Sequence, residues 1–162
     1  MSKISGKFAA AGIASLAVTG ALISTASPAT AATAGAQHCA VDVQSRQSAC
    51  AADEAVAMQR AGVSAASVLA VRLYDGINYT GASYSFYVTS PCTAGYEGEY
   101  GNPNLGSFSD KASSVHTYNH CDVHLHDPIN YGSPYSVWID QSANLANIGT
   151  GWSNRTSSIG VS

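Results

Sequence analysis

Short runs in which apolar and polar residues alternate fill the chain after Val68. Val71 and Leu73 alternate with Arg72 and Tyr74, and the same spacing recurs further along. Residues on one face of a strand lie two apart, so this spacing predicts strands with one buried face. The other runs set Tyr84, Phe86 and Val88 against Ser83, Ser85 and Tyr87, and Val123 and Leu125 against His124 and His126. Because Gly, Asn and Pro separate these short strands, we expect an all-β, antiparallel sandwich or barrel.

The segment before these runs, residues 32–67, has a different composition. It is rich in Ala, Ser and Gln and holds few large apolar residues. Within it, Ala51–Ala61 consists of residues that a helix tolerates. We interpret 32–67 as an N-terminal arm, which is either a short helix tied down by a Cys39–Cys50 disulfide or a loosely attached extension. The main domain then covers 68–162.

The first 31 residues have the three parts of a secretory signal peptide. Lys3 and Lys7 form a basic start, and an apolar run follows from Phe8 to about Ile23. Small residues then lead to an Ala-Thr-Ala cleavage site that ends at Ala31. A membrane anchor is the alternative, but the run is short for one and two glycines interrupt it. We therefore expect cleavage of 1–31 and export of roughly 130 residues, one domain's worth, with no membrane association afterwards.

The cysteines support an extracellular location. An even number of cysteines in an exported chain indicates disulfides, and four cysteines allow three pairings. We favour Cys39–Cys50 and Cys92–Cys121, because each bond then closes a local unit. A metal site is the alternative, but the sequence has no Cys-x-x-Cys spacing.

The charge balance bears on possible partners. Without the leader, five arginines and lysines remain against ten aspartates and glutamates. A phosphate backbone is bound by clustered cations, and the sequence has no such cluster. We therefore expect no nucleic-acid partner.

An internal repeat is the most informative feature of the chain. The segment Leu73–Gly81 returns as Leu125–Gly132, one residue shorter, and Ser107–Val115 returns as Gly151–Ile159. Two separate segments recur in the same order, which indicates duplicated units that share one core. We interpret the first segment of each pair as a folded hairpin and the second as a turn that enters a strand.

These repeated segments resemble a known family. The pattern Tyr74-x4-Tyr79-x-Gly81 is similar to the signature hairpin of βγ-crystallin Greek keys. The two Ser-Ser segments resemble the calcium-binding stretch of microbial members. The resemblance covers about Val68–Ser162 and implies a Greek-key sandwich of two related halves. Among secreted bacterial members, the pattern is most similar to the Streptomyces-type metalloproteinase inhibitors and to a related killer-toxin-like group.

The resemblance also implies calcium ligands. Together with hairpin carbonyls, four side chains would supply oxygen: Asp110, Ser113, Asn154 and Ser157. Calcium takes six to eight oxygen ligands. However, Ser109 and Ser153 stand where the family has Asn or Asp, which removes one donor from each site. We expect weak calcium binding as one alternative and simple turns as the other, and no cofactor is required.

Histidine is concentrated in one stretch of the sequence. The cluster consists of His116, His120, His124 and His126. Neutral imidazoles can bind zinc. However, His124 and His126 align with Arg72 and Tyr74 of the first half, at positions expected to face outward. We therefore interpret the four residues as a surface cluster without ligand function.

Signatures of catalysis are missing from the sequence. It contains no His-Glu-x-x-His, no Gly-x-Ser-x-Gly and no Gly-rich phosphate loop before a helix. Glu97 and Glu99 are close enough in sequence to imitate a carboxylate pair, but they lie in a Gly- and Tyr-rich loop. We interpret them as solvated charges and expect that the protein is not an enzyme.

The long connection Thr89–Gly106 is our candidate for a partner-binding loop, and the alternative is a long connection without a binding role. Loops of that length in compact domains are often functional. The candidate contact residues are Tyr96, Glu97, Glu99 and Tyr100. Cys92 at the start of the loop would anchor it through Cys121, which would reduce the entropy lost on binding.

Three functions remain open at this point. The resemblance favours a secreted, monomeric peptidase inhibitor directed at a metalloproteinase. The alternatives are a calcium-binding structural module and a killer-toxin-like antimicrobial protein that binds a cell-wall component. The residues by themselves support an extracellular, β-rich binding protein.

Overall fold

A computed structural model describes residues 37–95 and 98–162 of the chain, and the predicted signal peptide lies outside them. None of the helical segments in these ranges has the length and apolar character that crossing a bilayer requires. The strands and the α-helix in this part of the chain are β1 (His38–Asp42), β2 (Gln47–Ala51), α1 (Glu54–Arg60), β3 (Val68–Tyr74), β4 (Ser83–Val88), β5 (Tyr100–Asn102), β6 (Ser114–Thr117), β7 (Val123–His126), β8 (Tyr135–Ile139), β9 (Gln141–Ser142) and β10 (Ser158–Val161). Two short 3-10 helices, η1 (Gly106–Phe108) and η2 (Leu145–Asn147), complete them.

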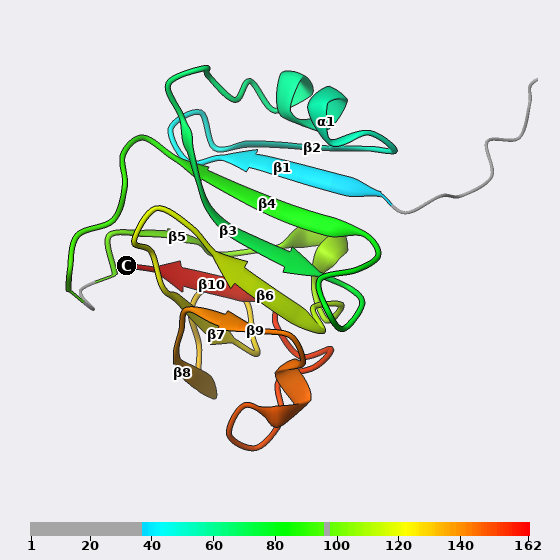
Figure 1. The fold of residues 1–162 in the computed structure, drawn as a ribbon, viewed down its shortest axis with the longest axis vertical. Helices are drawn as coiled ribbons and strands as arrows, with labels where there is room; N and C mark the ends of the chain where they lie inside the picture. Colours follow the sequence, from blue (N-terminus) through cyan, green and yellow to red (C-terminus); the bar gives the residue numbers. More distant parts are fainter. Residues whose placement is uncertain (1–36, 96–97) are drawn as a thin grey trace, which may run out of the picture. The chain divides into compact units, whose positions relative to one another are not determined.

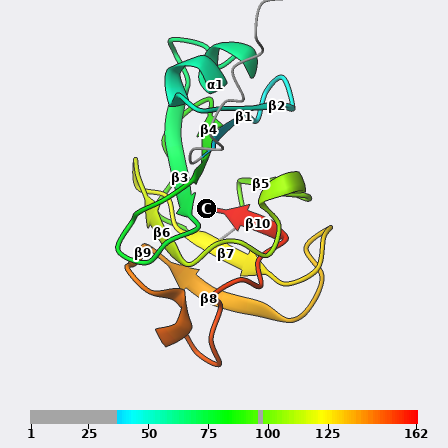
Figure 2. The same cartoon turned by 90° about the vertical axis from the view of Figure 1, so that its right-hand side faces the viewer.

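The strands form two sheets, which Figure 1 and Figure 2 show from two sides. The larger sheet has the order β2-β1-β4-β3-β6-β9, and the smaller has the order β5-β10-β7-β8. In each half the first two strands form a hairpin, and the fourth strand, β6 or β10, returns beside the first. This return is the mark of a Greek key. The all-β, Greek-key sandwich of two related halves is therefore confirmed.

The third strand of each half leaves its own sheet. Strand β5 of the first half pairs with β10, and β9 of the second half pairs with β6. Each sheet is thus completed by a strand from the other half.

The alternating positions supply the core between the sheets, as predicted. Val71, Leu73 and Phe86 of the larger sheet belong to the same buried cluster as Val123 and Leu125 of the smaller one. None of the five is more than 1% exposed. A shift of strand register by one residue would turn such a set toward water, so the core fixes the pairing.

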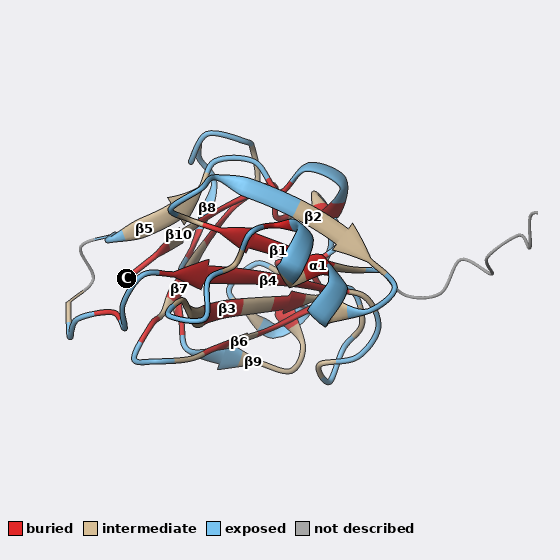
Figure 3. Ribbon diagram, turned by 90° about the horizontal axis from the view of Figure 1, so that it is seen from above, coloured by how far each residue is buried: buried red, intermediate tan, exposed pale blue. Residues whose placement is uncertain are grey.

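Strand β4 is buried on both faces, whereas alternation predicted only one buried face. Ser83, Ser85 and Tyr87 are all at most 5% exposed, and Figure 3 shows the whole strand as buried. The N-terminal segment covers the second face. Ala57 of α1 and Ala61, which caps the C-terminal end of that helix, pack in one cluster with Tyr87. The prediction was wrong here because it treated the N-terminal segment as an arm that covers nothing.

Residues 38–51 extend the larger sheet, a feature that composition did not indicate. Strand β1 pairs with β2 in antiparallel and with β4 in parallel orientation. Cys39 lies opposite Cys50, and the expected disulfide joins them. Strand β2 reads Gln-Ser-Ala-Cys-Ala, which lacks the β-branched and aromatic residues that favour strands. Pairing and the disulfide therefore hold this hairpin rather than intrinsic propensity.

The expected helix is present in a shorter form, Glu54–Arg60 instead of Ala51–Ala61. It begins after Asp53, whose side chain accepts a hydrogen bond from the Val56 amide at 3.2 Å. Such an N-cap satisfies one of the amides that lack partners in the first turn. The three residues before Glu54 belong to β2 and the turn, so the helix cannot start earlier.

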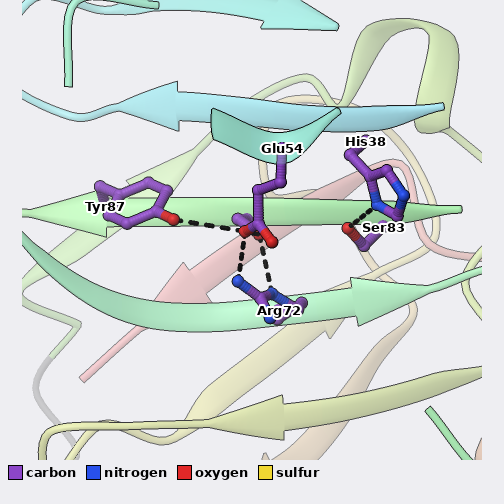
Figure 4. Close-up of polar contacts among 6 residues, drawn as sticks. His38, Glu54, Arg72, Ser83 and Tyr87 are labelled. Atoms are coloured by element: carbon purple, nitrogen blue, oxygen red, sulfur yellow. Dashed lines mark hydrogen bonds and ion pairs between the residues drawn. The ribbon is translucent and has the colours of Figure 1, made fainter. Parts of the chain in front are cut away.

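A polar network fixes α1 to the sheet (Figure 4). Glu54 accepts hydrogen bonds from Arg72, from the Ser85 hydroxyl at 2.8 Å and from the Tyr87 hydroxyl at 3.3 Å. Arg72 also donates to Ser85 at 2.9 Å. Burial and the negative charge of Glu54 raise the pKa of Tyr87, so this hydroxyl keeps its proton and donates. One carboxylate thereby satisfies three polar side chains beneath the helix.

We predict that Glu54→Ala lowers the free energy of unfolding by about 1–3 kcal/mol, because the change leaves a mostly buried guanidinium without its counter-charge. The Arg72 side chain is only 23% exposed. Denaturant unfolding followed by circular dichroism measures the change. The control is Gln59→Ala on the exposed side of α1, which should stay within about 0.5 kcal/mol of the parent. Equal stability of the two variants would contradict the prediction.

Candidate functional site

Each half carries the same folded hairpin after its first strand. Asn78 and Tyr79 adopt positive φ angles of 56° and 61°, and Asn130 and Tyr131 both have φ near this value, at 59°. Residues other than glycine are uncommon in this region, so each hairpin needs support from its surroundings. The repeat found in the sequence is therefore a repeat of backbone conformation.

A buried serine from the fourth strand gives that support in both halves. The Ser114 hydroxyl donates to the Gly76 carbonyl at 2.7 Å and accepts from the Tyr79 amide at 3.0 Å. Ser158 makes the equivalent two bonds, at 2.8 and 3.0 Å, in the second hairpin. Both serines are fully buried.

The aromatic pair of the hairpin also recurs. Tyr79 lies edge-on to Tyr74 at 5.8 Å between ring centroids. In the second half Tyr131 lies edge-on to His126 at 5.7 Å. Histidine thus replaces tyrosine without loss of the ring contact, and His126 is tied further by a contact of 3.1 Å between Nδ1 and the Gly132 carbonyl.

The predicted calcium ligands meet across the two halves. Ser157 donates to Asp110 at 3.1 Å, and Ser113 approaches Asn154 at 3.4 Å. Backbone hydrogen bonds also connect the two halves here. The Asp110 amide donates to the Thr156 carbonyl, and the Asn154 amide donates to the Ala112 carbonyl. Asp110 and Asn154 both have positive φ angles, 58° and 57°. The sequence identified the residues but could not tell which half's serine meets which half's acid or amide.

These donors fit a calcium ion unequally. The Asp110–Ser157 pair offers a carboxylate and a hydroxyl, whereas Asn154–Ser113 offers an amide and a hydroxyl. The carboxylate of Asp127 in the second hairpin is already engaged in an ion pair, because its Oδ2 accepts hydrogen bonds from two nitrogens of Arg155 at 3.0 and 3.1 Å. Calcium is bound most tightly where carboxylates are numerous, so the first pair is the better candidate.

The loop between β4 and β6 is held at several points. Its disulfide is Cys92–Cys121, as expected. Glu99 accepts from the backbone amide of Thr93 at 3.0 Å and also from its hydroxyl, and the hydroxyls of Tyr100 and Ser90 lie 2.9 Å apart. Two of the four predicted contact residues, Glu99 and Tyr100, therefore brace the loop itself.

The other two predicted contact residues, Tyr96 and Glu97, lie outside the described residues. The connection is not a continuous loop either, because it contains β5, the strand exchanged into the smaller sheet. Just before these two residues in the sequence, the Gly95 carbonyl accepts a hydrogen bond from the Ser162 hydroxyl.

The four histidines do not form one cluster. His116 lies 4.5 Å from the Tyr118 ring and 5.6 Å from that of Tyr79, and His120 is exposed. His124 and His126 lie together elsewhere, with ring centroids 5.0 Å apart. Within the described residues, no group of three His, Cys, Asp or Glu side chains could hold a metal ion.

The prediction of an outward-facing surface site was wrong for His126, which is only 7% exposed. Tyr131 on one side and Tyr135, at 5.7 Å, on the other cover its ring. His126 still lies on the same face of β7 as His124, with the ring centroids 5.0 Å apart, so its burial comes from these two covering tyrosines, which strand alternation does not predict.

Five rings form a continuous cluster on the smaller sheet, and sequence analysis did not single out three of them. Trp138 stacks on His124 at 4.8 Å, and Tyr135 lies edge-on to the same histidine at 4.7 Å. His126 and Tyr131 continue the row. The sequence signal that could have drawn attention to this strand is the pair Tyr135 and Val137, two large apolar residues spaced two apart. In the structure both are more than half exposed.

The ring cluster borders a groove of about 970 Å³. Its floor includes Gly101 and Gly160, which lie opposite each other in the β5–β10 ladder. Its far wall comes from the β1–β2 hairpin, including Val41, Asp42 and Arg46. A volume near the upper end of the usual range for ligand sites makes this groove the main binding candidate of the described chain.

Burial sets the protonation of the groove. Burial and the neighbouring His126 lower the pKa of His124, so its ring is neutral at pH 7. Burial also raises the pKa of Tyr131, although the charge of Arg46 opposes that shift. Asp42 accepts from the Ser45 amide at 2.8 Å and from the Ser67 hydroxyl at 3.1 Å, so its carboxylate is satisfied by the protein.

No protein-family model matches the chain, and no curated protein matches it. Solved structures are similar to part of it. A βγ-crystallin domain from Flavobacterium johnsoniae is 23% identical with a TM-score of 0.41, over 57% of this chain and 93% of that one. A βγ-crystallin from an archaeon is 25% identical with a TM-score of 0.41, over 57% and 96%. One from Ciona intestinalis is 15% identical with a TM-score of 0.42, over 56% and 95%.

These likenesses concern the fold. The Greek-key order of both halves, with their third strands exchanged between the sheets, rests on the strand pairing of this chain itself. The additional β1–β2 hairpin and α1 lie before the predicted start of the duplicated domain, at Val68.

We predict that the protein loses stability between about pH 7.5 and pH 5.5, and that His124 causes part of the loss. Its pKa is lower in the folded than in the unfolded chain, so protonation favours unfolding, and the stabilisation present above the unfolded pKa is lost as the pH falls. Melting temperatures across this window measure the slope. His124→Gln should flatten it, whereas the exposed control His120→Gln should not. An unchanged slope in His124→Gln would count against the prediction.

Proposed function

We propose that this protein is a secreted peptidase inhibitor directed at a metalloproteinase, and that it acts through the loop of residues 89–106. The observation that carries the proposal is the bracing of the described residues of this loop, which lie on both sides of residues 96 and 97. The Cys92–Cys121 disulfide holds one end, the Glu99–Thr93 contacts span its middle, and β5 fixes the other end in a sheet. A loop that is ordered before binding loses less entropy when the complex forms.

Export and the lack of catalysis are part of this proposal. Two disulfides support an oxidising compartment, as does the signal-like sequence of 1–31. The negative balance of charged residues and the lack of a cation cluster support a protein partner over a nucleic acid. We propose that the inhibitor is a monomer that blocks its target by occupying the target's substrate cleft.

The first prediction from this proposal is stoichiometric inhibition. The oxidised mature protein, titrated against a thermolysin-type metalloproteinase with a fluorogenic peptide, should reach an equivalence point near 1:1. Glu99→Ala should raise the inhibition constant about tenfold, because it frees the loop from Thr93. The control is Gln141→Ala on the exposed edge strand β9, which should leave the constant unchanged. Full activity of the proteinase at large molar excess would rule the proposal out for this class of target.

A second candidate function is a calcium-stabilised structural module. The observation that favours it is the reciprocal pairing of Asp110 with Ser157 and of Asn154 with Ser113. Calcium would be held by these side chains and by hairpin carbonyls, and would bridge the two halves. A bound ion would supply a positive charge at the place where residues of both halves meet.

This candidate predicts a calcium-dependent melting temperature. With a Kd of about 1 mM, about 5 mM calcium stabilises the fold by about 1 kcal/mol. That corresponds to a rise of roughly 3–5 °C for a domain of this size. Asp110→Asn should abolish the rise, since it removes the carboxylate without changing the shape, and magnesium serves as the control ion. A melting temperature that ignores calcium would eliminate this candidate.

A further inference from the structure

We propose that the groove between the β1–β2 hairpin and the smaller sheet binds a neutral polysaccharide chain. This goes beyond the inhibitor proposal and does not rest on it. The alternative of a cell-wall partner had no residues assigned to it, and the groove supplies them. Three features of the groove carry the inference, namely its rings, its floor and its charges.

The rings form a surface suited to sugars. Trp138, His124 and Tyr131 line the groove, and the largely covered His126 connects them, with neighbouring centroids in this row 4.8, 5.0 and 5.7 Å apart. Tyr131 is 44% exposed, and Tyr135, which contacts both histidines, is 59% exposed. A pyranose ring has an apolar face of C–H groups that packs against aromatic rings, and its hydroxyls bond to ring-edge groups such as the Tyr hydroxyl and the Trp N–H.

Part of the floor, at Gly160, is bare backbone. Gly101 and Gly160 face each other across β5 and β10, in strand interiors where glycine is unfavourable. A Cβ on Gly101 would lie 2.9 Å from the Tyr131 hydroxyl, so the tyrosine packed over it accounts for that glycine. A Cβ on Gly160 would meet nothing closer than 3.7 Å, at His124, so no contact within the protein requires glycine there. Glycine in such a place marks a close approach to the backbone, and here a flat ligand can lie against it.

The charges favour a neutral ligand. The carboxylate of Asp42 is bonded to Ser45 and Ser67, and that of Glu99 is bonded to Thr93. Arg46 is the one arginine among the groove-lining residues, and no lysine lines it. Because anionic polymers require clustered cations, the groove is a poor site for them.

Fixed amide side chains complete the polar edge. Asn102 accepts from the Asn104 amide at 3.0 Å and donates to the Tyr84 hydroxyl. Asn104 accepts from the Gly106 amide at 2.8 Å. Amides in set orientations distinguish ligands by the direction of their hydroxyl groups. The groove therefore combines a stacking surface with ordered polar groups, as sites for small polar ligands do.

The test uses the purified, oxidised mature protein. It is sedimented with insoluble chitin, cellulose and β-1,3-glucan, and titrated with their soluble hexasaccharides while tryptophan fluorescence is followed. Trp152 is only 4% exposed in the core, so a change in emission reports on Trp138. We expect at least one of the three polymers to bind and its hexasaccharide to change the emission. Trp138→Ala should weaken retention on that polymer at least tenfold.

Two further variants separate binding from folding. Gly160→Val fills the floor and suits a strand, so it should keep the melting temperature and lose binding at least tenfold. Tyr131→Ala should also weaken binding, whereas its counterpart in the first hairpin, Tyr79→Ala, should not. No binding to any of the polymers or hexasaccharides would overturn the proposal, and so would binding that survives both Trp138→Ala and Gly160→Val. If tryptophan emission changes with a casein peptide digest but with none of the sugars, the proposal is overturned and the ligand of the groove is a peptide. Proteinase inhibition is assayed on the same variants, so failure of one proposal leaves the other measurable.

Discussion

One buried serine hydroxyl in each half holds the folded hairpin of that half. Both the candidate calcium residues and the aromatic groove depend on these hairpins. Ser114 and Ser158 each satisfy a carbonyl and an amide of a backbone that has two consecutive residues at positive φ. Loss of such a hydroxyl would leave two buried polar groups without partners, at a cost of about 1–3 kcal/mol each. Ser158 thereby sets the direction in which Tyr131 enters the groove. The neighbouring serines, Ser113 and Ser157, meet the residues of the opposite half.

Much of the fold could be predicted from sequence because it follows from local patterns. Alternation gave the core positions of β3, β4 and β7, and the repeat gave the duplicated Greek keys. The β1–β2 hairpin could not be predicted in this way, because its order comes from pairing with β4 and from a disulfide. The candidate sites show the same limit. Asp110 and Ser157 were found as residues but not as a pair, and the groove draws on segments more than 100 residues apart, from Val41 to Gly160.

The two halves have the same plan but present different outer faces. In the first half, Arg72 points from the sheet into a network with Glu54, and α1 covers it. The equivalent residue of the second half, His124, stacks on Trp138 beside the groove. The N-terminal segment therefore closes the outer face of one sheet, while its hairpin walls a groove on the other. After duplication the second half therefore carries the aromatic ring cluster on its outer face, whereas α1 covers the corresponding face of the first half.

The exchange of β5 and β9 has a consequence for how the molecule comes apart. Neither half forms a complete sheet by itself, because the edge strand of each sheet comes from the other half. Unfolding of one half strips an edge from its partner and opens the shared core, so the halves cannot melt in sequence as two independent bodies. We therefore expect the duplicated domain to unfold as one cooperative unit, so that a single backbone cut in either half destabilises both.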